Sequence, residues 1–151
     1  MLTYRDGNLF EDTADAIVNP INCMGVMGAG LALLYKQAYP ANYDAYRARC
    51  LRREVKVGEM FVFKFKDRPN PRYIVNFPTK IHWRDGSKLD YIQVGLADLV
   101  RVVHAYELKS VALPRIGCGL GQLSWPVVNS LIKEYAEGLQ NVDIRIYGED
   151  V

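Results

Sequence analysis

The sequence holds few of the residues that build metal centres or disulfide frameworks. Its 151 residues include three cysteines and two histidines. Cys23, Cys50 and Cys118 form no C-x-x-C pair, and an odd, widely spaced set does not suit a disulfide framework or a structural zinc site. We therefore expect no metal ion, no cofactor and a reducing environment.

Long hydrophobic runs and a strong net charge are also missing. No apolar stretch reaches the roughly 18 residues of a membrane span, and residues 1–6 hold no apolar core of a signal peptide. These absences predict a soluble, cytoplasmic protein. The formal net charge of +2 is too small to indicate nucleic-acid binding by itself, because a local basic patch matters more than the total.

What is present is the composition of an ordinary globular protein, with 50% hydrophobic and 24% charged residues. The length predicts a single domain, residues 1–151. Apolar runs bounded by glycine and proline alternate with segments of helical periodicity. Strands are expected within 2–9 and at 15–19, 60–65, 72–77, 110–113 and 143–147, with Pro20 ending the second and Pro78 closing the fourth. Helices are expected from 31 to just before Pro40, at 41–53, at 88–106 after an N-cap at Ser87, and after an N-cap at Ser124.

This alternation predicts an α/β fold with a mixed, largely parallel sheet covered on both faces by helices. Ligands of such sheets bind beyond the carboxyl ends of the strands. Three loops follow strands directly, at 20–30, 78–86 and 114–124. We expect these loops to meet at one edge of the sheet and to form one cleft.

Two of these loops are rich in glycine, at 19–30 and 114–121. Each follows an apolar run and precedes a helical pattern. Glycines let backbone N–H groups crowd toward a ligand, and a helix N-terminus attracts an anion. Two such loops suggest a diphosphate held from both sides. Neither loop fits the dinucleotide or P-loop fingerprint, so simple turn formation remains an alternative for each. Cys118 lies between two glycines of the second loop. It is either a nucleophile or, as is commoner, a small buried thiol.

The segments 15–22, 76–83 and 116–121, together with the first glycine loop, resemble the macrodomain family over essentially the whole chain. The family binds ADP-ribose above a mixed, about six-stranded sheet in a three-layer α/β/α arrangement. The segments 76–83 and 117–120 are similar to the branch of DNA-acting antitoxins that remove ADP-ribose from thymidine in single-stranded DNA. For that branch the resemblance implies an ADP-ribosyl glycohydrolase, with a DarT-type toxin as partner through a region outside this chain, and no membrane.

The resemblance also implies roles for individual residues. Asn22 matches the asparagine that bonds the distal ribose, and Lys80 matches the catalytic lysine, so both are expected to be catalytic. ADP-ribose is expected to contact Asn8, Leu9, Ile21, Asn22, Val26, Met27, Gly28, Gly30, Pro114, Gly117, Cys118, Gly119, Leu120 and Gly121. Thr79, His82, Trp83 and Arg84 are expected on the nucleobase and DNA side, where aromatic faces can stack on an unpaired base. For Trp83 the alternative is a side chain that fills the core.

Two positions depart from the family pattern. Many macrodomains carry an aspartate where this chain has Asn8, which can still accept a hydrogen bond but without charge. A related branch carries a catalytic aspartate where this chain has Gly121. The missing acid favours a DNA substrate, because a thymine imide is an easier leaving group than an alkoxide.

Several alternatives remain open at this stage. Lys80 is a neutral amine that attacks the distal ribose, an ammonium that stabilises developing negative charge, or simply a solvated loop lysine. The protein is either the hydrolase described above, a non-catalytic ADP-ribose-binding module, or a hydrolase of protein ester-linked ADP-ribose or O-acetyl-ADP-ribose.

Overall fold

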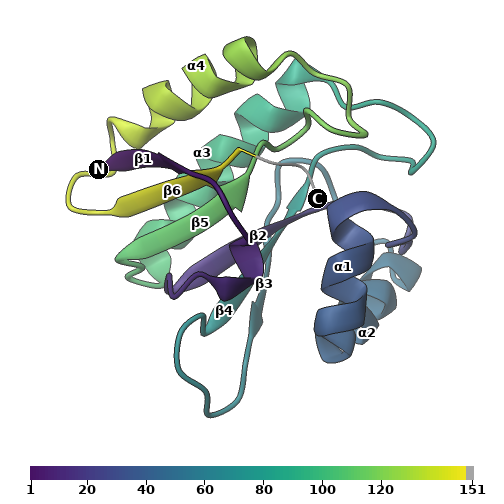
Figure 1. Cartoon of the computed structure of the whole chain (residues 1–151). Helices are drawn as coiled ribbons and strands as arrows, with labels where there is room; N and C mark the ends of the chain where they lie inside the picture. Colours follow the sequence, from purple (N-terminus) through teal and green to yellow (C-terminus); the bar gives the residue numbers. More distant parts are fainter. Residues whose placement is uncertain (149–151) are drawn as a thin grey trace.

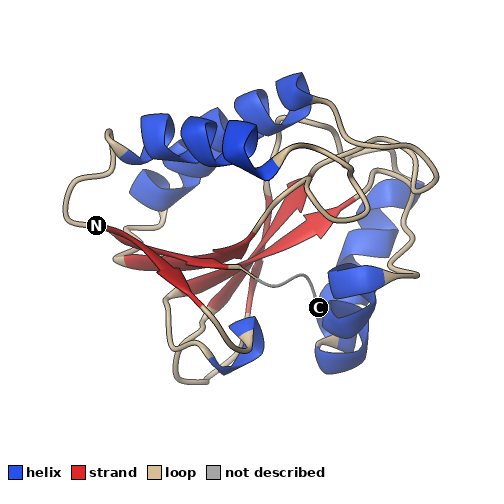
Figure 2. Ribbon diagram, turned by 45° about the horizontal axis from the view of Figure 1, so that its top comes forward, coloured by secondary structure: helices blue, strands red, loops and turns tan. Residues whose placement is uncertain are grey.

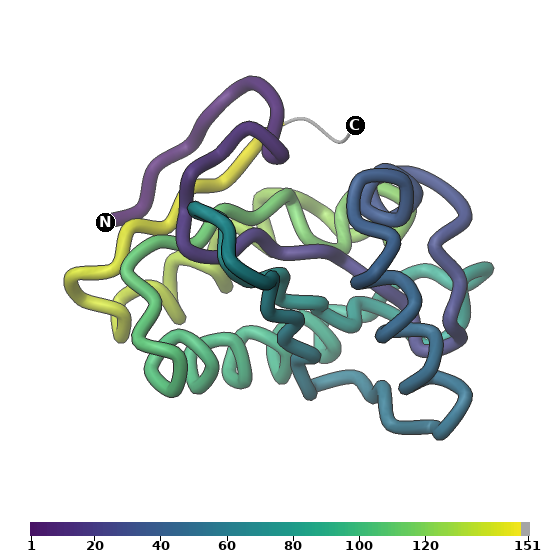
Figure 3. Tube along the Cα trace, turned by 90° about the horizontal axis from the view of Figure 1, so that it is seen from below, coloured from purple at the N-terminus to yellow at the C-terminus, as the bar shows by residue number. Residues whose placement is uncertain are grey.

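A computed structural model describes residues 1–148. A six-stranded sheet has the order β1-β6-β5-β2-β4-β3. The strands are β1 (Leu2–Arg5), β2 (Ala16–Ile21), β3 (Phe61–Lys64), β4 (Tyr73–Pro78), β5 (Ser110–Pro114) and β6 (Asp143–Tyr147). Only β3 runs antiparallel to its neighbour, so the sheet is mixed and largely parallel, as predicted. The first and last strands lie side by side at one edge (Figure 3).

The helices form a layer on each face of the sheet (Figures 1 and 2). The α-helices are α1 (Gly30–Ala38), α2 (Pro40–Leu51), α3 (Leu89–Ala105) and α4 (Trp125–Ala136), and a short 3₁₀ helix spans Leu9–Glu11. The pairs α1–α2 and α3–α4 each pack together. The predicted three-layer α/β/α architecture is confirmed.

The hydrophobic clusters on the two faces of the sheet follow the alternation of side chains along the strands. In β2, Ala16 and Val18 belong to the core beneath α3 and α4. Ile17 and Ile21 point to the opposite face, where they join clusters that contain Tyr35 of α1 and Tyr46 of α2. Both faces of the central strand are therefore buried, which explains why its sequence is apolar without clear alternation.

The prediction that Pro20 ends the second strand was wrong, because β2 continues through it to Ile21. The carbonyls of Asp15 and Ile21 accept bonds from the β4 side. Backbone groups of successive residues point to opposite sides of a strand, so the nitrogen of Pro20 points away from β4 and toward β5. The pairing with β5 stops at Ile17, so the N–H that proline lacks costs no ladder bond.

Two predicted helix boundaries also need correction. Lys88, not Ser87, is the N-cap of α3, and it makes no side-chain capping bond. The Ser87 hydroxyl donates instead to the carbonyl of Thr79, which closes the loop between β4 and α3. Helix α2 ends at Leu51 rather than at Arg53, which has a φ of 59°. Ser124 is the N-cap residue of α4 as predicted, although its side chain makes no capping bond.

Candidate active site

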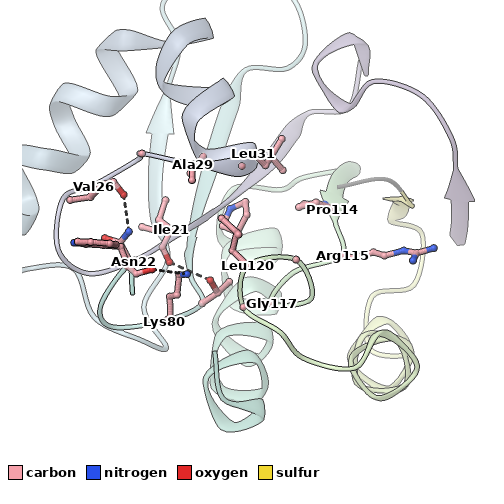
Figure 4. Close-up of a pocket in the computed structure, with 18 residues that line it drawn as sticks. Ile21, Asn22, Val26, Ala29, Leu31, Lys80, Pro114, Arg115, Gly117 and Leu120 are labelled. Atoms are coloured by element: carbon pink, nitrogen blue, oxygen red, sulfur yellow. Dashed lines mark hydrogen bonds between the residues drawn. The ribbon is translucent and has the colours of Figure 1, made fainter. Parts of the chain in front are cut away.

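One large pocket lies beyond the carboxyl ends of β2, β4 and β5, where the three loops meet as predicted (Figure 4). Its volume is about 530 Å³. The loops are tied to one another by backbone bonds. Cys23 donates its N–H to the carbonyl of Ile81 at 2.9 Å, and Ser87 donates to Gly121 at 2.9 Å. The pocket is therefore built by three connected loops rather than by three independent ones.

Most of the residues predicted for the site line this pocket. They are Ile21, Asn22, Val26, Gly28, Gly30, Thr79, Lys80, Trp83, Pro114, Gly117, Gly119, Leu120 and Gly121. Both predicted catalytic residues are among them. The site thus brings together two residues that are separated by almost 60 positions in the sequence, because β2 and β4 are neighbours in the sheet.

Six other predicted residues do not line the pocket, and several have structural contacts. Leu9 is 2% exposed and Met27 is 1% exposed, so both are core residues. The Asn8 side chain caps the 3₁₀ helix by accepting the N–H of Phe10 at 2.9 Å. The Cys118 thiol lies 3.5 Å from the carbonyl of Ile116. His82 and Arg84 lie in the β4–α3 loop, outside the pocket lining.

Asn22 is held rigidly in the pocket wall. It is 6% exposed, and its amide nitrogen donates to the carbonyl of Val26 at 2.7 Å (Figure 4). Its side-chain oxygen accepts from the N–H of Met24 at 2.9 Å, and it shares the single hydroxyl proton of Tyr46, at 2.9 Å, with the backbone carbonyl of Asn22, which lies 2.8 Å from the same hydroxyl. With both lone pairs of the oxygen engaged, the group that remains for a ligand is the second N–H of the amide. Asn22 therefore offers a fixed donor.

Lys80 extends into the pocket from the loop after β4 (Figure 4). Its Nζ donates to the carbonyl of Trp83 at 3.1 Å. Burial lowers the pKa of Lys80, and the nearby charge of Asp85 partly opposes this effect. An amine with a lowered pKa is easier to deprotonate, which suits a nucleophile or base. The same group remains a cation in its protonated form, so geometry allows both roles.

The N-terminus of α1 opens directly onto the pocket. Gly30, Leu31 and Ala32 form the first turn of this helix and line the cavity. The N-cap residue, Ala29, has no side chain that could bond their N–H groups. These unpaired donors, together with the helix dipole, favour an anion at this point.

The second glycine loop packs too tightly to carry side chains at two positions. A Cβ on Gly121 would lie 2.5 Å from the carbonyl oxygen of Gly117. Gly117 itself has a φ of 75°, and a Cβ there would lie 2.9 Å from Ile92. Across the pocket, a Cβ on Gly30 would lie 3.2 Å from Leu120. The glycines therefore let the two loops approach each other, and the loop conformation leaves no room for an acid at position 121.

Five lining residues were not predicted from the sequence: Pro20, Ala29, Leu31, Ala32 and Arg115. Four of them are apolar and lie close in the sequence to predicted residues, at the end of β2 or the start of α1. This position was the signal that could have identified them. Arg115 contributes to the wall, but its guanidinium points away from the pocket (Figure 4) and lies 4.9 Å from the ring of Trp125.

Residues 1–148 contain no group of three or more histidine, cysteine or acidic side chains placed to hold a metal ion. Within the same range, no helix has the length and apolar character needed to cross a membrane.

Comparison with known proteins places this geometry in a family. The sequence model of the Macro domain matches residues 18–132. A protein of Thermus aquaticus named DNA ADP-ribosyl glycohydrolase is 45% identical over 147 residues, which make up 97% of this chain and 41% of that protein. The chain thus spans about two fifths of the length of the DNA ADP-ribosyl glycohydrolases that it matches.

Solved structures agree with this result. The macrodomain of Mycobacterium tuberculosis DarG is 44% identical and superposes with a TM-score of 0.96, covering 99% of this chain and 98% of that one. Thermosipho africanus DarTG in complex with ADP-ribose is 30% identical, with a TM-score of 0.89 over 97% of this chain and 41% of that one. The fold, the pocket between the three loops and these similarities lead to one conclusion: the chain belongs to the macrodomain family.

Proposed function

We propose that this macrodomain removes ADP-ribose from ADP-ribosylated thymidine in single-stranded DNA and thereby acts as the antitoxin to a DarT-type toxin. The observation that carries the proposal is the joint position of Asn22 and Lys80 in one pocket with the two glycine loops. The name and the 45% identity of the Thermus aquaticus relative support it. The partner implied by this antitoxin role is a DarT-type toxin.

In this proposal the backbone binds the diphosphate. The open N-terminus of α1 supplies N–H groups to one phosphate, and the loop 117–121 closes on the other side. Binding energy from this unreactive part of the substrate then positions the distal ribose. The remaining amide N–H of Asn22 bonds a hydroxyl of that ribose and fixes the ring against the attacking group.

The reaction is the hydrolysis of an N-glycosidic bond. The bond between C1″ of the distal ribose and the imide nitrogen of thymine breaks through an oxocarbenium-like state. The oxygen of water forms the new bond to C1″, and its proton neutralises the released imide. Lys80 acts either by stabilising the departing base as an ammonium or by attacking C1″ first and releasing a transient adduct to water.

The DNA side of the pocket is assigned to the β4–α3 loop, with Thr79, His82, Trp83 and Arg84. Trp83 lines the pocket and is 49% exposed. Its backbone carbonyl accepts the bond from Lys80. A half-exposed tryptophan in the pocket lining, whose backbone holds the Lys80 amine, is placed to stack on the thymine or on its neighbour.

Substitution of Lys80 tests the proposal. We expect Lys80→Ala to lower the release of ADP-ribose from a modified oligonucleotide by at least ~10²-fold, the usual size of losing one positioned charged group. Calorimetry is expected to show an almost unchanged affinity for ADP-ribose. Lys133→Ala, on the exposed face of α4, is the matched control and should retain full activity.

The same assay separates the alternatives. ADP-ribose binding without release from any substrate would identify a binding module instead of an enzyme. Faster release from glutamyl-modified protein or from O-acetyl-ADP-ribose than from DNA would move the proposal to an ester hydrolase. Near-normal activity of Lys80→Ala would contradict the assignment of the site.

A further inference from the structure

Helix α2 places an arginine beside the loop that carries Asn22. Tyr43 donates its hydroxyl to the carbonyl of Gly25 at 3.3 Å, and the N–H of Gly25 bonds the hydroxyl of Tyr46 at 3.2 Å. A Cβ built on Gly25 would lie 3.7 Å from the Cγ of Arg47. The stem of Arg47 therefore runs along the β2–α1 loop, next to the end of the pocket where the distal ribose is expected.

Arg47 forms no ion pair among residues 1–148. It is exposed and has no acidic partner within 4.0 Å in this range. Two arginines that follow it are engaged elsewhere: the guanidinium of Arg49 lies 4.3 Å from the centre of the Phe61 ring, and Arg52 pairs with Glu54 at 2.7 Å. Arg47 is thus a free cation beside the site.

Two apolar residues on the neighbouring loops form a rim: Met24 directly precedes Gly25, and Ile81 directly follows Lys80. Met24 and Ile81 are each 51% exposed, although both follow a pocket-lining residue closely in the chain. The bond from Cys23 N–H to the carbonyl of Ile81 holds the two loops together at this point. Exposed apolar side chains on two bonded loops, each close in the chain to a pocket-lining residue, offer a surface for contact with a ligand that extends out of the pocket.

We propose that this rim binds the nucleotides that flank the modified thymidine, an inference that rests on the proposed function. Met24 and Ile81 pack against unpaired bases, and Arg47 binds an adjacent phosphate of the same strand. Base faces are available for such packing only when the bases are unstacked and unpaired. The rim therefore selects single-stranded over double-stranded DNA, and it acts outside the ADP-ribose pocket.

The test compares two substrates that differ only in the flanking nucleotides: ADP-ribosylated thymidine as a nucleoside, and the same group within a single-stranded oligonucleotide. For Arg47→Gln we expect KM for the oligonucleotide to rise about two- to fivefold at low ionic strength, the effect of one exposed charge contact. KM for the nucleoside and kcat for both substrates should stay unchanged. The dependence of log KM on log salt should weaken by about 0.7, the value for one phosphate contact on a single strand.

Two further variants complete the design. Met24→Ser combined with Ile81→Ser should reduce the preference of the enzyme for single-stranded over double-stranded oligonucleotides, again without effect on the nucleoside. Arg101→Gln is the matched control, because Arg101 lies on α3 and pairs with Asp98 at 2.6 Å. It should leave both substrates unaffected.

The outcomes separate this inference from the proposed function. Equal changes in KM for both substrates, or no change in KM for the oligonucleotide, would contradict the proposed binding of flanking nucleotides. The proposed hydrolase function would be unaffected by either result. If the wild-type protein released ADP-ribose from neither substrate, the proposed function would fail. The rim would then be judged by the affinity for unmodified oligothymidylate in fluorescence anisotropy. Weaker binding by Arg47→Gln than by Arg101→Gln would support the rim, and equal binding would overturn it.

Discussion

Removal of a single hydroxyl outside the pocket should impair the chemistry inside it. The Tyr46 hydroxyl lies on α2 and is fully buried. It contacts the backbone carbonyl of Asn22 at 2.8 Å, the side-chain oxygen of Asn22 at 2.9 Å and the N–H of Gly25 at 3.2 Å. Tyr46→Phe deletes all three contacts and keeps the ring that fills the core.

The magnitude follows from the groups left behind. Gly25 is buried, so its N–H loses its hydrogen-bond partner in a place that water does not reach, at a cost of about 1–3 kcal/mol. A loss of 2 kcal/mol would lower Tm by about 4–8 °C in a protein of this size. Asn22 retains its bonds to Val26 and Met24 but loses one of three side-chain anchors. Misalignment of one positioning group should lower kcat by about tenfold, since orientation contributes steeply to rate.

Two measurements on matched variants test this reasoning. Urea unfolding gives the free energy of unfolding, and release of ADP-ribose from a modified oligonucleotide gives kcat. Tyr43→Phe is the control, because its hydroxyl bonds the carbonyl of Gly25 in the same loop without contacting Asn22. We expect kcat to fall for Tyr46→Phe only. Equal kcat values for the two variants, with Tyr46→Phe less stable, would show that the hydroxyl supports the fold and does not position Asn22.

Two further predictions concern the glycine loop and pH. Gly121→Ala should abolish or strongly weaken ADP-ribose binding in calorimetry, because the new Cβ would collide with the backbone of the same loop. The control Gly138→Ala should bind ADP-ribose normally, because its Cβ would make only an ordinary contact at 3.6 Å. If Lys80 reacts as a neutral amine, kcat should rise with pH up to its lowered pKa, below the ordinary 10.5, and Asp85→Asn should move this rise to lower pH. If Lys80 acts as an ammonium, kcat should instead fall as pH passes the same pKa, and a pH-independent kcat would contradict both roles.

The features of the fold that depend on local sequence pattern could be predicted from the sequence. The order of strands and helices and the meeting of three loops followed from apolar periodicity and from the rule that parallel strands end at one edge. Pro20 was misjudged because its effect depends on which neighbour its nitrogen faces, and that is decided by pairing far along the chain. The link between Tyr46 and Asn22 left no signal for the same reason, since a buried tyrosine at a helical spacing is usually only a core residue.

The composition of the pocket wall also limits which bonds can be broken. Among the described residues that line it, Lys80 and Arg115 are charged, and none is acidic. Gly121 cannot be replaced by an acid without a collision with Gly117. A site that lacks a carboxylic acid to protonate the leaving group suits groups that depart as stable anions, such as a thymine imide or a carboxylate, and does not suit an alkoxide. Under the proposed function, the pocket thus selects the class of leaving group, and the choice between DNA and protein as the carrier falls to Trp83 in the pocket lining and to Arg47 on α2.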